Sequence, residues 1–228
     1  MSSGTSRSSF ILAQTTLTSP PLVPEIRLHL ATDARGIFQT LRDSGIDTSW
    51  QPYWAFAWPG GQALARYVLD NPALVAGKTV MDIGAGSGVA AIAAAAAGAS
   101  RVAAADPDPL AAAAIQINAR ENGVEIEIVT DDMLGREPQA DLILIADLVY
   151  ELELEVRVTR FLEAARARNA QVILADRTTA RRPPLAVSLL GEYRAPLTPL
   201  LEESHFEHAR VWRLEPARPS LAGNRTAP

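Results

Sequence analysis

The sequence predicts an α/β fold with a doubly wound, mostly parallel seven-stranded sheet. From residue 79 to residue 176, short apolar segments alternate with longer segments that have helical spacing. Strands separated by single helices form βαβ units, which pair in parallel. A glycine-rich turn follows the first apolar segment. Near the C-terminus, residues 205–215 alternate apolar and polar side chains, which predicts a last strand that inserts antiparallel into the sheet.

The elements before this repeat are short. Residues 25–30 alternate and are expected to form a strand, and residues 33–43 suit a helix. Residues 60–70 have helical spacing, and Asn71-Pro72 ends that helix.

The repeat itself supplies most of the predicted sheet. Strands are expected at 79–83, 101–106, 125–130, 141–147 and 171–176. The helices that connect them are expected at 88–98, 108–122 and 154–168. A further helix is predicted over 183–193, before the final strand.

A single domain is expected over residues 21–216. The Ser/Thr-rich segment 1–20 and the segment 217–228 are predicted to be flexible tails. The N-terminal segment lacks a charged region followed by a long apolar region, so it does not resemble a secretory signal. The segment holds one arginine and no acidic residue, so a transit peptide stays open as an alternative. The prediction that we prefer is a flexible tail on a cytoplasmic protein.

Composition narrows the function classes. The chain has no cysteine and only three scattered histidines, so no metal site is expected. The net charge of −5 disfavours a nucleic-acid partner and suits a basic protein partner. The longest apolar run, residues 90–99, is too short to span a membrane. We expect a monomer without a nucleic-acid or membrane partner.

The glycine-rich turn is the first candidate site. Gly84, Ala85, Gly86 and Gly88 connect the first strand of the repeat to its helix, and Asp82 lies near the end of that strand, two residues before Gly84. Glycines let a backbone turn tightly and approach a ligand, and the following helix offers free N–H groups. A tight strand-to-helix turn without a ligand accounts for the glycines equally well.

Two further acids follow the next strands. Asp106 comes 22 residues after Gly84, where an acid accepts the hydroxyls of a ribose. Its alternative role is the N-cap of the helix that begins beyond Pro107. Asp132 is placed to meet an adenine amino group and Met133 to pack on the ring, whereas the alternative is a solvated loop.

This arrangement resembles the class I S-adenosylmethionine-dependent methyltransferases. The glycines follow the pattern G-x-G-x-G with an acid two residues before it, and Val89 stands where a dinucleotide fingerprint wants Gly or Ala. The resemblance implies a Rossmann-like sheet with an antiparallel seventh strand and S-adenosylmethionine as cofactor. It also implies that Asp82 and the glycine loop hold the methionine part, Asp106 the ribose, and Asp132 with Met133 the adenine.

The fourth strand of the repeat ends in Asp147-Leu148-Val149-Tyr150, which resembles the D-x-x-Y signature of seven-strand protein lysine methyltransferases. The resemblance implies that Asp147 and Tyr150 are catalytic residues that position the acceptor amine. A helix cap for Asp147 and a core position for Tyr150 are the alternatives. A lysine amine with a reference pKa near 10.4 must be neutral to attack, so the protein would contribute mainly proximity and orientation.

The segment WAFAWPGG over residues 54–61 concentrates the chain's aromatic residues. Together with the flanking residues 50–62 it resembles the electron transfer flavoprotein β-subunit lysine methyltransferases, which implies that flavoprotein subunit as the substrate. Trp58 and its neighbours are then expected to wall the cofactor cavity, since aromatic faces suit cations; the alternative is a core role. Three other functions stay open: a ribosomal-protein lysine methyltransferase, a nicotinamide-dependent oxidoreductase and a non-catalytic cofactor-binding assembly factor.

Overall fold

The predicted sheet is present in the computed structural model, which describes residues 6–46, 49–137, 139–148, 152–177, 185–196 and 206–216. The large sheet has the order β5-β4-β3-β6-β7-β9-β8. Its strands are β3 (Thr79–Ile83), β4 (Arg101–Ala105), β5 (Glu127–Val129), β6 (Leu142–Ala146), β7 (Gln171–Arg177), β8 (Val187–Pro196) and β9 (Phe206–Leu214). Only β9 runs antiparallel to its neighbours, β7 and β8. This confirms the expected fold class and the position of the last strand.

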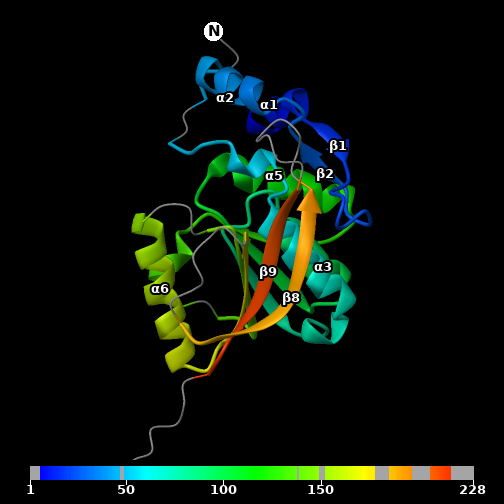
Figure 1. Ribbon diagram of the computed structural model, residues 1–228. Helices are drawn as coiled ribbons and strands as arrows, with labels where there is room; N and C mark the ends of the chain where they lie inside the picture. Colours follow the sequence, from blue (N-terminus) through cyan, green and yellow to red (C-terminus); the bar gives the residue numbers. More distant parts are fainter. Residues whose placement is uncertain are drawn as a thin grey trace, which may run out of the picture.

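Helices cover both faces of the sheet. Three of them, α3 (Pro59–Asp70), α4 (Val89–Ala96) and α5 (Pro109–Glu121), lie on one face, and α6 (Leu152–Ala167) covers the other. Figure 1 shows α3 and α6 on opposite sides of the strands. The predicted helices and strands between residues 79 and 177 are all found, with ends shifted by two residues or fewer.

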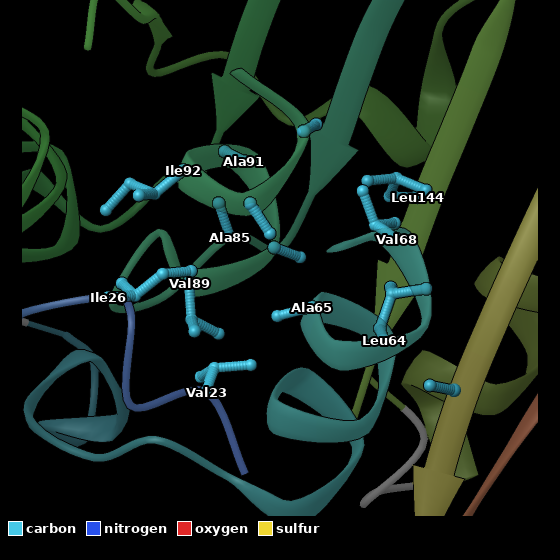
Figure 2. Close-up of a cluster of buried hydrophobic side chains, with 14 of the residues drawn as sticks. Val23, Ile26, Leu64, Ala65, Val68, Ala85, Val89, Ala91, Ile92 and Leu144 are labelled. Atoms are coloured by element: carbon cyan, nitrogen blue, oxygen red, sulfur yellow. The ribbon is translucent and has the colours of Figure 1, made fainter. Parts of the chain in front are cut away.

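The strands are buried on both faces because their alternate side chains enter two separate cores. In β6, Leu142 and Leu144 pack into the core beneath α3 and α4, whereas Ile143 and Ile145 pack against α6. Figure 2 shows Leu144 of the first core beside Leu64 and Val68 of α3. Because β3, β4, β6 and β7 pair in parallel, their carboxyl ends lie along one edge of the sheet, and burial on both faces holds them there.

Helix α4 is made almost entirely of alanine and is buried from Val89 to Ala94. Small side chains let neighbouring backbones approach closely. At Gly61 in the first turn of α3, an added Cβ would lie 3.2 Å from Cγ1 of Val89. The start of α3 is therefore held against the start of α4, next to the glycine-rich turn.

The N-terminal segment corrects the prediction of a flexible tail over 1–20. From Arg7 the chain folds as α1 (Arg7–Gln14) and β1 (Thr16–Thr18), and β1 pairs antiparallel with β2 (Leu28–Leu30). The buried side chains of Phe10 and Ile11 pack beside α2 (Ala34–Asp43) and α5. The apolar spacing in this segment extends over only about one and a half turns, which is too short to predict a helix from the sequence. The segment is ordered because Phe10 and Ile11 are buried against other elements. The tail predicted over 217–228 lies outside the described residues.

The prediction of a helix over 183–193 is wrong, because the chain forms the strand β8 from Val187 to Pro196. Backbone pairing with β9 decides the outcome: β8 aligns with it from Val187 to Pro196, with a register shift between Leu189 and Gly191. A short apolar run does not separate helix from strand by its periodicity alone. Gly191, which favours a bulge in a strand and weakens a helix, was the local signal against the helix.

Candidate active site

A cavity of about 280 Å³ opens at the carboxyl ends of β3, β4, β6 and β7. Its volume is near the lower end of the range for small-molecule sites, about 300–1,000 Å³. Nearly every site residue that the sequence predicts lines it: Trp58, Asp82, Gly84, Ala85, Gly86, Asp106, Asp132, Met133 and Asp147. Gly88 lies behind the wall, and Tyr150 lies outside the described residues.

The glycine-rich turn connects β3 to α4 and forms the floor of the cavity. Gly84 has a φ of 69°, a left-handed conformation that favours glycine, and an added Cβ would lie 2.3 Å from Cδ2 of Leu148. Gly88 is the N-cap of α4, also with a positive φ, and faces Ile115 rather than the cavity. The turn thus needs glycine for its own path as well as for access.

Asp82 is buried beneath this floor. Its Oδ2 accepts a hydrogen bond of 3.0 Å from the backbone N–H of Ala91 in the first turn of α4. Burial raises the pKa of Asp82 to about 7, and the nearby carboxylate of Asp106 acts in the same direction. A buried acid of this kind is stabilised in its charged form by a cationic ligand group, such as an ammonium.

Asp106 ties the glycine turn to the end of β4. One carboxylate oxygen accepts from the N–H of Gly86 at 2.9 Å, and the other accepts from the N–H of Asp108 at 3.0 Å. The N-cap of α5 is Asp108, whose side chain accepts from Leu110 N at 2.8 Å. The alternative N-cap role for Asp106 is therefore wrong. Burial raises the pKa of Asp106, which lies on the cavity wall where a ribose is expected.

Asp132 and Met133 form the far wall of the cavity. Asp132 accepts from Leu134 N at 3.1 Å and forms an ion pair with Arg157 of α6. Met133 is buried against the α6 core while it lines the cavity. Asp132 is thus anchored rather than merely solvated, and Met133 presents a flexible apolar surface.

Asp147 follows β6 in a left-handed conformation, with a φ of 52°. Its Oδ2 accepts a 2.8 Å hydrogen bond from the N–H of Gly61 in the first turn of α3. The N-cap of α3 is Trp58, which makes no side-chain cap bond, so Asp147 supplies the missing cap from a distant strand. The predicted cap alternative thus has a physical basis, but in the helix that precedes Asp147 rather than in the one that follows.

The second oxygen of Asp147, Oδ1, is buried and has no hydrogen-bond partner among the described residues. Burial raises the pKa of Asp147 to about 7, and Asp176 adds to this shift. The N–H of Gly61, the charge of Arg177 and, to a smaller extent, the N–H of Gly60 oppose it. At Gly60 an added Cβ would lie 2.6 Å from Oδ1. The two glycines of the Trp-Pro-Gly-Gly segment therefore make room for this carboxylate, which retains one oxygen for a ligand.

The aromatic segment serves the cavity and the core together. Trp54, Phe56 and Trp58 line the cavity, while Trp54 and Phe56 are also buried among α1, α2 and α5. Trp58 makes edge-to-face contacts with Tyr53 and Phe56, with ring centroids 5.9 and 5.7 Å apart. Its Nε1 donates to the carbonyl oxygen of Tyr53 at 2.9 Å. The segment WAFAWPGG therefore contributes side chains to a cavity wall and to the core at the same time.

Sequence reasoning missed Asp176 and Arg177, which line the cavity at the end of β7, and Arg157 of α6. A signal was available for Asp176. Three strands end in the dipeptide Ala-Asp, at residues 105–106, 146–147 and 175–176. Because parallel strands end at the same edge, the third of these acids was as strong a candidate as the other two.

Two other kinds of site are not found in the described part of the chain. No group of three or more His, Asp or Glu residues is arranged there to hold a metal ion. None of the described helices combines the length and the apolar character needed to cross a membrane.

Comparisons with known proteins agree with this geometry. Residues 63–164 match the family model described as Ribosomal protein L11 methyltransferase (PrmA). The Electron transfer flavoprotein beta subunit lysine methyltransferase of Xenopus laevis is 36% identical over 221 residues, which cover 94% of this chain and 89% of the frog protein.

Solved structures share the fold. The ribosomal protein L11 methylase of Lactobacillus delbrueckii subsp. bulgaricus aligns with a TM-score of 0.51 at 24% identity, over 68% of this chain and 78% of that chain. The magnesium protoporphyrin IX methyltransferase of Synechocystis PCC 6803, solved with bound SAM, aligns with a TM-score of 0.51 at 17% identity, over 68% of this chain and 79% of that chain.

The sheet order, the glycine floor and the acidic cavity define a class I methyltransferase that uses S-adenosylmethionine. Asp147, which offers a buried free oxygen beside this floor, suits an amine as the methyl acceptor. The near full-length match to the frog protein then places the chain more narrowly: it belongs to the electron transfer flavoprotein beta subunit lysine methyltransferase family and is a protein lysine methyltransferase.

The residues present fit S-adenosylmethionine. Its sulfonium and ammonium groups are cationic, and the cavity is walled by the carboxylates of Asp82, Asp106 and Asp147 and by aromatic faces. The glycine floor leaves room for close backbone approach, and no Lys or Arg lies within the turn itself. Asp106 and Met133, which are expected to meet the ribose and the adenine, both line this cavity.

Proposed function

We propose that this enzyme methylates lysine ε-amines of the β-subunit of the electron transfer flavoprotein. The observation that supports this substrate is the match over 94% of the chain to a relative that carries that name. The geometry around Asp147 supports lysine as the acceptor residue, because Asp147 lines the cavity together with aromatic side chains, and one of its buried carboxylate oxygens has no hydrogen-bond partner among the described residues.

S-adenosylmethionine supplies an activated methyl group. The chain's contribution on that side is binding: Gly84 and Gly86 form the floor, Asp106 lies where the ribose hydroxyls are expected, and Asp82 favours the ammonium. Asp132 and Met133 complete the adenine side. Together these residues fix the direction from which the methyl group meets the acceptor.

Asp147 orients the acceptor amine. Its Oδ2 is held by Gly61, so the carboxylate does not rotate freely, and Oδ1 accepts an N–H of the amine. A carboxylate favours the charged ammonium, so Asp147 positions the amine but does not deprotonate it. The amine loses its proton to water, aided by desolvation and by the cationic ligand. Its lone pair would then form the new N–C bond as the bond between the methyl group and the sulfonium sulfur breaks, and the neutral thioether product would leave. Catalysis rests mainly on proximity and orientation.

A direct reaction tests the substrate. The purified enzyme is incubated with S-adenosylmethionine and the flavoprotein, and in parallel with ribosomal protein L11, and methylated peptides are mapped by mass spectrometry. We expect lysine methylation of the flavoprotein β-subunit. Methylation confined to the ribosomal protein would move the substrate to the second candidate, which the match of residues 63–164 to the L11 methyltransferase family model favours.

We propose further that the enzyme works as a monomer in the cytoplasm, without a nucleic-acid partner. The net charge of −5 supports a basic protein segment as the partner instead. Light scattering of the purified protein measures the oligomeric state, and a gel-shift titration with RNA measures nucleic-acid binding.

A further inference from the structure

Asn118 of α5 is a polar side chain without exposed surface, and both ends of its amide are hydrogen-bonded. Its Nδ2 donates to the carbonyl oxygen of Ser87 in the glycine-rich turn at 2.9 Å, and its Oδ1 accepts from the backbone N–H of His29 in β2 at 2.7 Å. These partners determine the orientation of the amide, because a carbonyl only accepts and a backbone N–H only donates. One buried side chain therefore joins the floor of the cavity to the N-terminal hairpin of β1 and β2.

The turn that Asn118 contacts needs support from outside. Gly86 and Gly88 have positive φ values of 52° and 82°. Glycine permits these conformations but also many others, so contacts have to fix the path of the turn. The N–H of Gly88 donates to the carbonyl oxygen of Ala85 at 2.7 Å, which closes the turn. Asn118 holds the carbonyl of Ser87 inside it, so the direction of that peptide group depends on a side chain of another element.

Ser87 connects this support to the ligand site. It lines the cavity, and its own N–H has no hydrogen-bond partner in the part of the chain that the structure describes. A backbone donor at the wall of a cavity is available to a ligand, because a buried N–H without a partner is costly. Rotation of the Ser87 backbone would move its carbonyl and its N–H relative to the cavity. The bond from Asn118 restrains that rotation.

We propose that Asn118 is a positioning residue for S-adenosylmethionine, which holds the glycine-rich turn in its binding conformation and couples that conformation to the N-terminal hairpin. Asn118 does not line the cavity, so it acts through Ser87 and not by touching the ligand. The proposal concerns the cofactor alone and does not depend on which protein is methylated.

Asn122, one turn further along α5, is the matched residue. Its Oδ1 accepts from the N–H of Arg27 at 2.9 Å, and its Nδ2 donates to the carbonyl oxygen of Arg27 at 2.6 Å. Arg27 directly precedes β2 (Leu28–Leu30). Both asparagines thus attach α5 to the same segment of the chain, and of the two only Asn118 reaches the glycine-rich turn.

The test compares Asn118→Ala with Asn122→Ala in the full chain. Both variants are expected to melt at a lower temperature than the wild type, since each loses hydrogen bonds between α5 and the segment around β2. Only Asn118→Ala is expected to raise the Kd of S-adenosylhomocysteine, by about tenfold, in calorimetry well below the melting temperatures. The KM for S-adenosylmethionine is expected to rise by the same factor. The kcat at saturation is expected to change by less than about twofold, because the turn holds the cofactor equally before and during transfer.

Two results of this comparison would overturn the proposal. If Asn118→Ala lowered the melting temperature and left the Kd unchanged, the side chain would only stabilise the fold. If both variants raised the Kd equally, the effect would not depend on the bond to Ser87.

Hydrogen exchange on the wild-type protein tests the link to the hairpin and needs no variant that folds. Coupling between two sites is reciprocal, so a ligand that binds at the turn is expected to hold β2 as well. We expect saturating S-adenosylhomocysteine to slow amide exchange in residues 27–30 by about tenfold. Exchange in β8, which lies outside the cavity lining, is expected to change by less than about twofold.

Equal slowing in both segments would show only the general stabilisation that any ligand of the folded state gives. Unchanged exchange in residues 27–30 would show that the hairpin is not coupled to the turn. Either result would overturn the proposed coupling, also in the case that Asn118→Ala does not fold.

Discussion

At the scale of single residues, the carboxylate of Asp147 has two tasks that its two oxygens divide. Oδ2 caps α3 through Gly61, and Oδ1 is buried without a partner in the described structure. A buried acceptor without a partner is costly, and such groups are retained where a ligand satisfies them. The cap fixes the direction of the free oxygen, so one residue links the stability of a helix to the geometry of the site.

Substitution separates the two tasks. Asp147→Asn retains an oxygen for the N–H of Gly61 but loses the charge, whereas Asp147→Ala loses both. We expect each variant to lose about a hundredfold in kcat, because the amine is no longer oriented. Only the alanine variant is expected to lose about 1 kcal/mol of stability as well. Thermal melting and single-turnover kinetics separate these effects, and an asparagine variant with full activity would remove Asp147 from the mechanism.

Gly60 offers an independent test of the same carboxylate. Gly60→Ala places a Cβ 2.6 Å from Oδ1 of Asp147, so the carboxylate has to move. We expect kcat to fall by about tenfold or more, since small displacements of a positioning group are costly. S-adenosylhomocysteine affinity, measured by calorimetry, is expected to change little. Gly135→Ala is the control, because an added Cβ there meets no atom within 4 Å; equal losses in both variants would contradict the prediction.

At the scale of elements, the connection from the end of β4 to the start of α5 contains two acids, and we assign ligand binding to one of them and helix capping to the other. Asp106 accepts a hydrogen bond from the N–H of Gly86 and is expected to meet the ribose, whereas Asp108 caps α5 by accepting from the N–H of Leu110. The two residues are separated by Pro107 alone, so the local sequence does not distinguish them. The hydrogen bonds do, because only one of these carboxylates reaches across to the glycine turn.

Alanine variants of these two acids are expected to have different defects, one in stability and the other in ligand binding. Asp108→Ala is expected to cost about 1 kcal/mol of stability through the lost cap. Asp106→Ala is expected to weaken S-adenosylhomocysteine binding by about tenfold or more, through lost hydrogen bonds to a charged group. Chemical denaturation and calorimetry on both variants measure the contrast. If Asp108→Ala weakened binding more than Asp106→Ala, the two roles would be reversed.

At the scale of the whole molecule, the folded sheet buries several acids at one edge, and this makes stability depend on pH. The pKa of Asp82 is raised to about 7, from about 3.9 in the unfolded chain. Between these values the folded state holds more protons than the unfolded state. The free energy of unfolding therefore falls as pH rises from about 4 to about 7 and changes no further above that. Asp147 acts in the same direction.

Asp82→Asn removes one such group and retains an oxygen for the N–H of Ala91. We expect the melting temperature of the wild-type protein to fall more steeply between pH 5 and pH 7 than that of the variant, so that the variant gains relative stability at pH 8. Calorimetric scans across this range measure the slopes. Parallel slopes would show that Asp82 is ionised in the folded protein throughout the range.

Local pattern was sufficient for the central part of the fold. Period and turn chemistry predicted every strand and α-helix between residues 79 and 177, and the acids that follow β4 and β6, but not the short 3-10 helix Met133–Gly135. The prediction from pattern was wrong for β8, because backbone pairing with β9 determines its conformation. It was also wrong for α1, because burial against other elements orders a segment with little helical periodicity. It also overlooked Asp176, whose place beside Asp147 depends on the parallel register of β6 and β7.

The sequence by itself determined the fold class, the glycine turn, the acids at its strand ends and the family to which they point. The tertiary structure alone decided how those groups act together. Gly61 and Asp147 are 86 residues apart in the chain, and their hydrogen bond exists because the sheet order brings the end of β6 to the start of α3. Periodicity records which side of an element is buried, whereas contacts between distant segments depend on how the elements pack. Because of that packing, Gly60 and Gly61 support the carboxylate of Asp147, which lines the cavity.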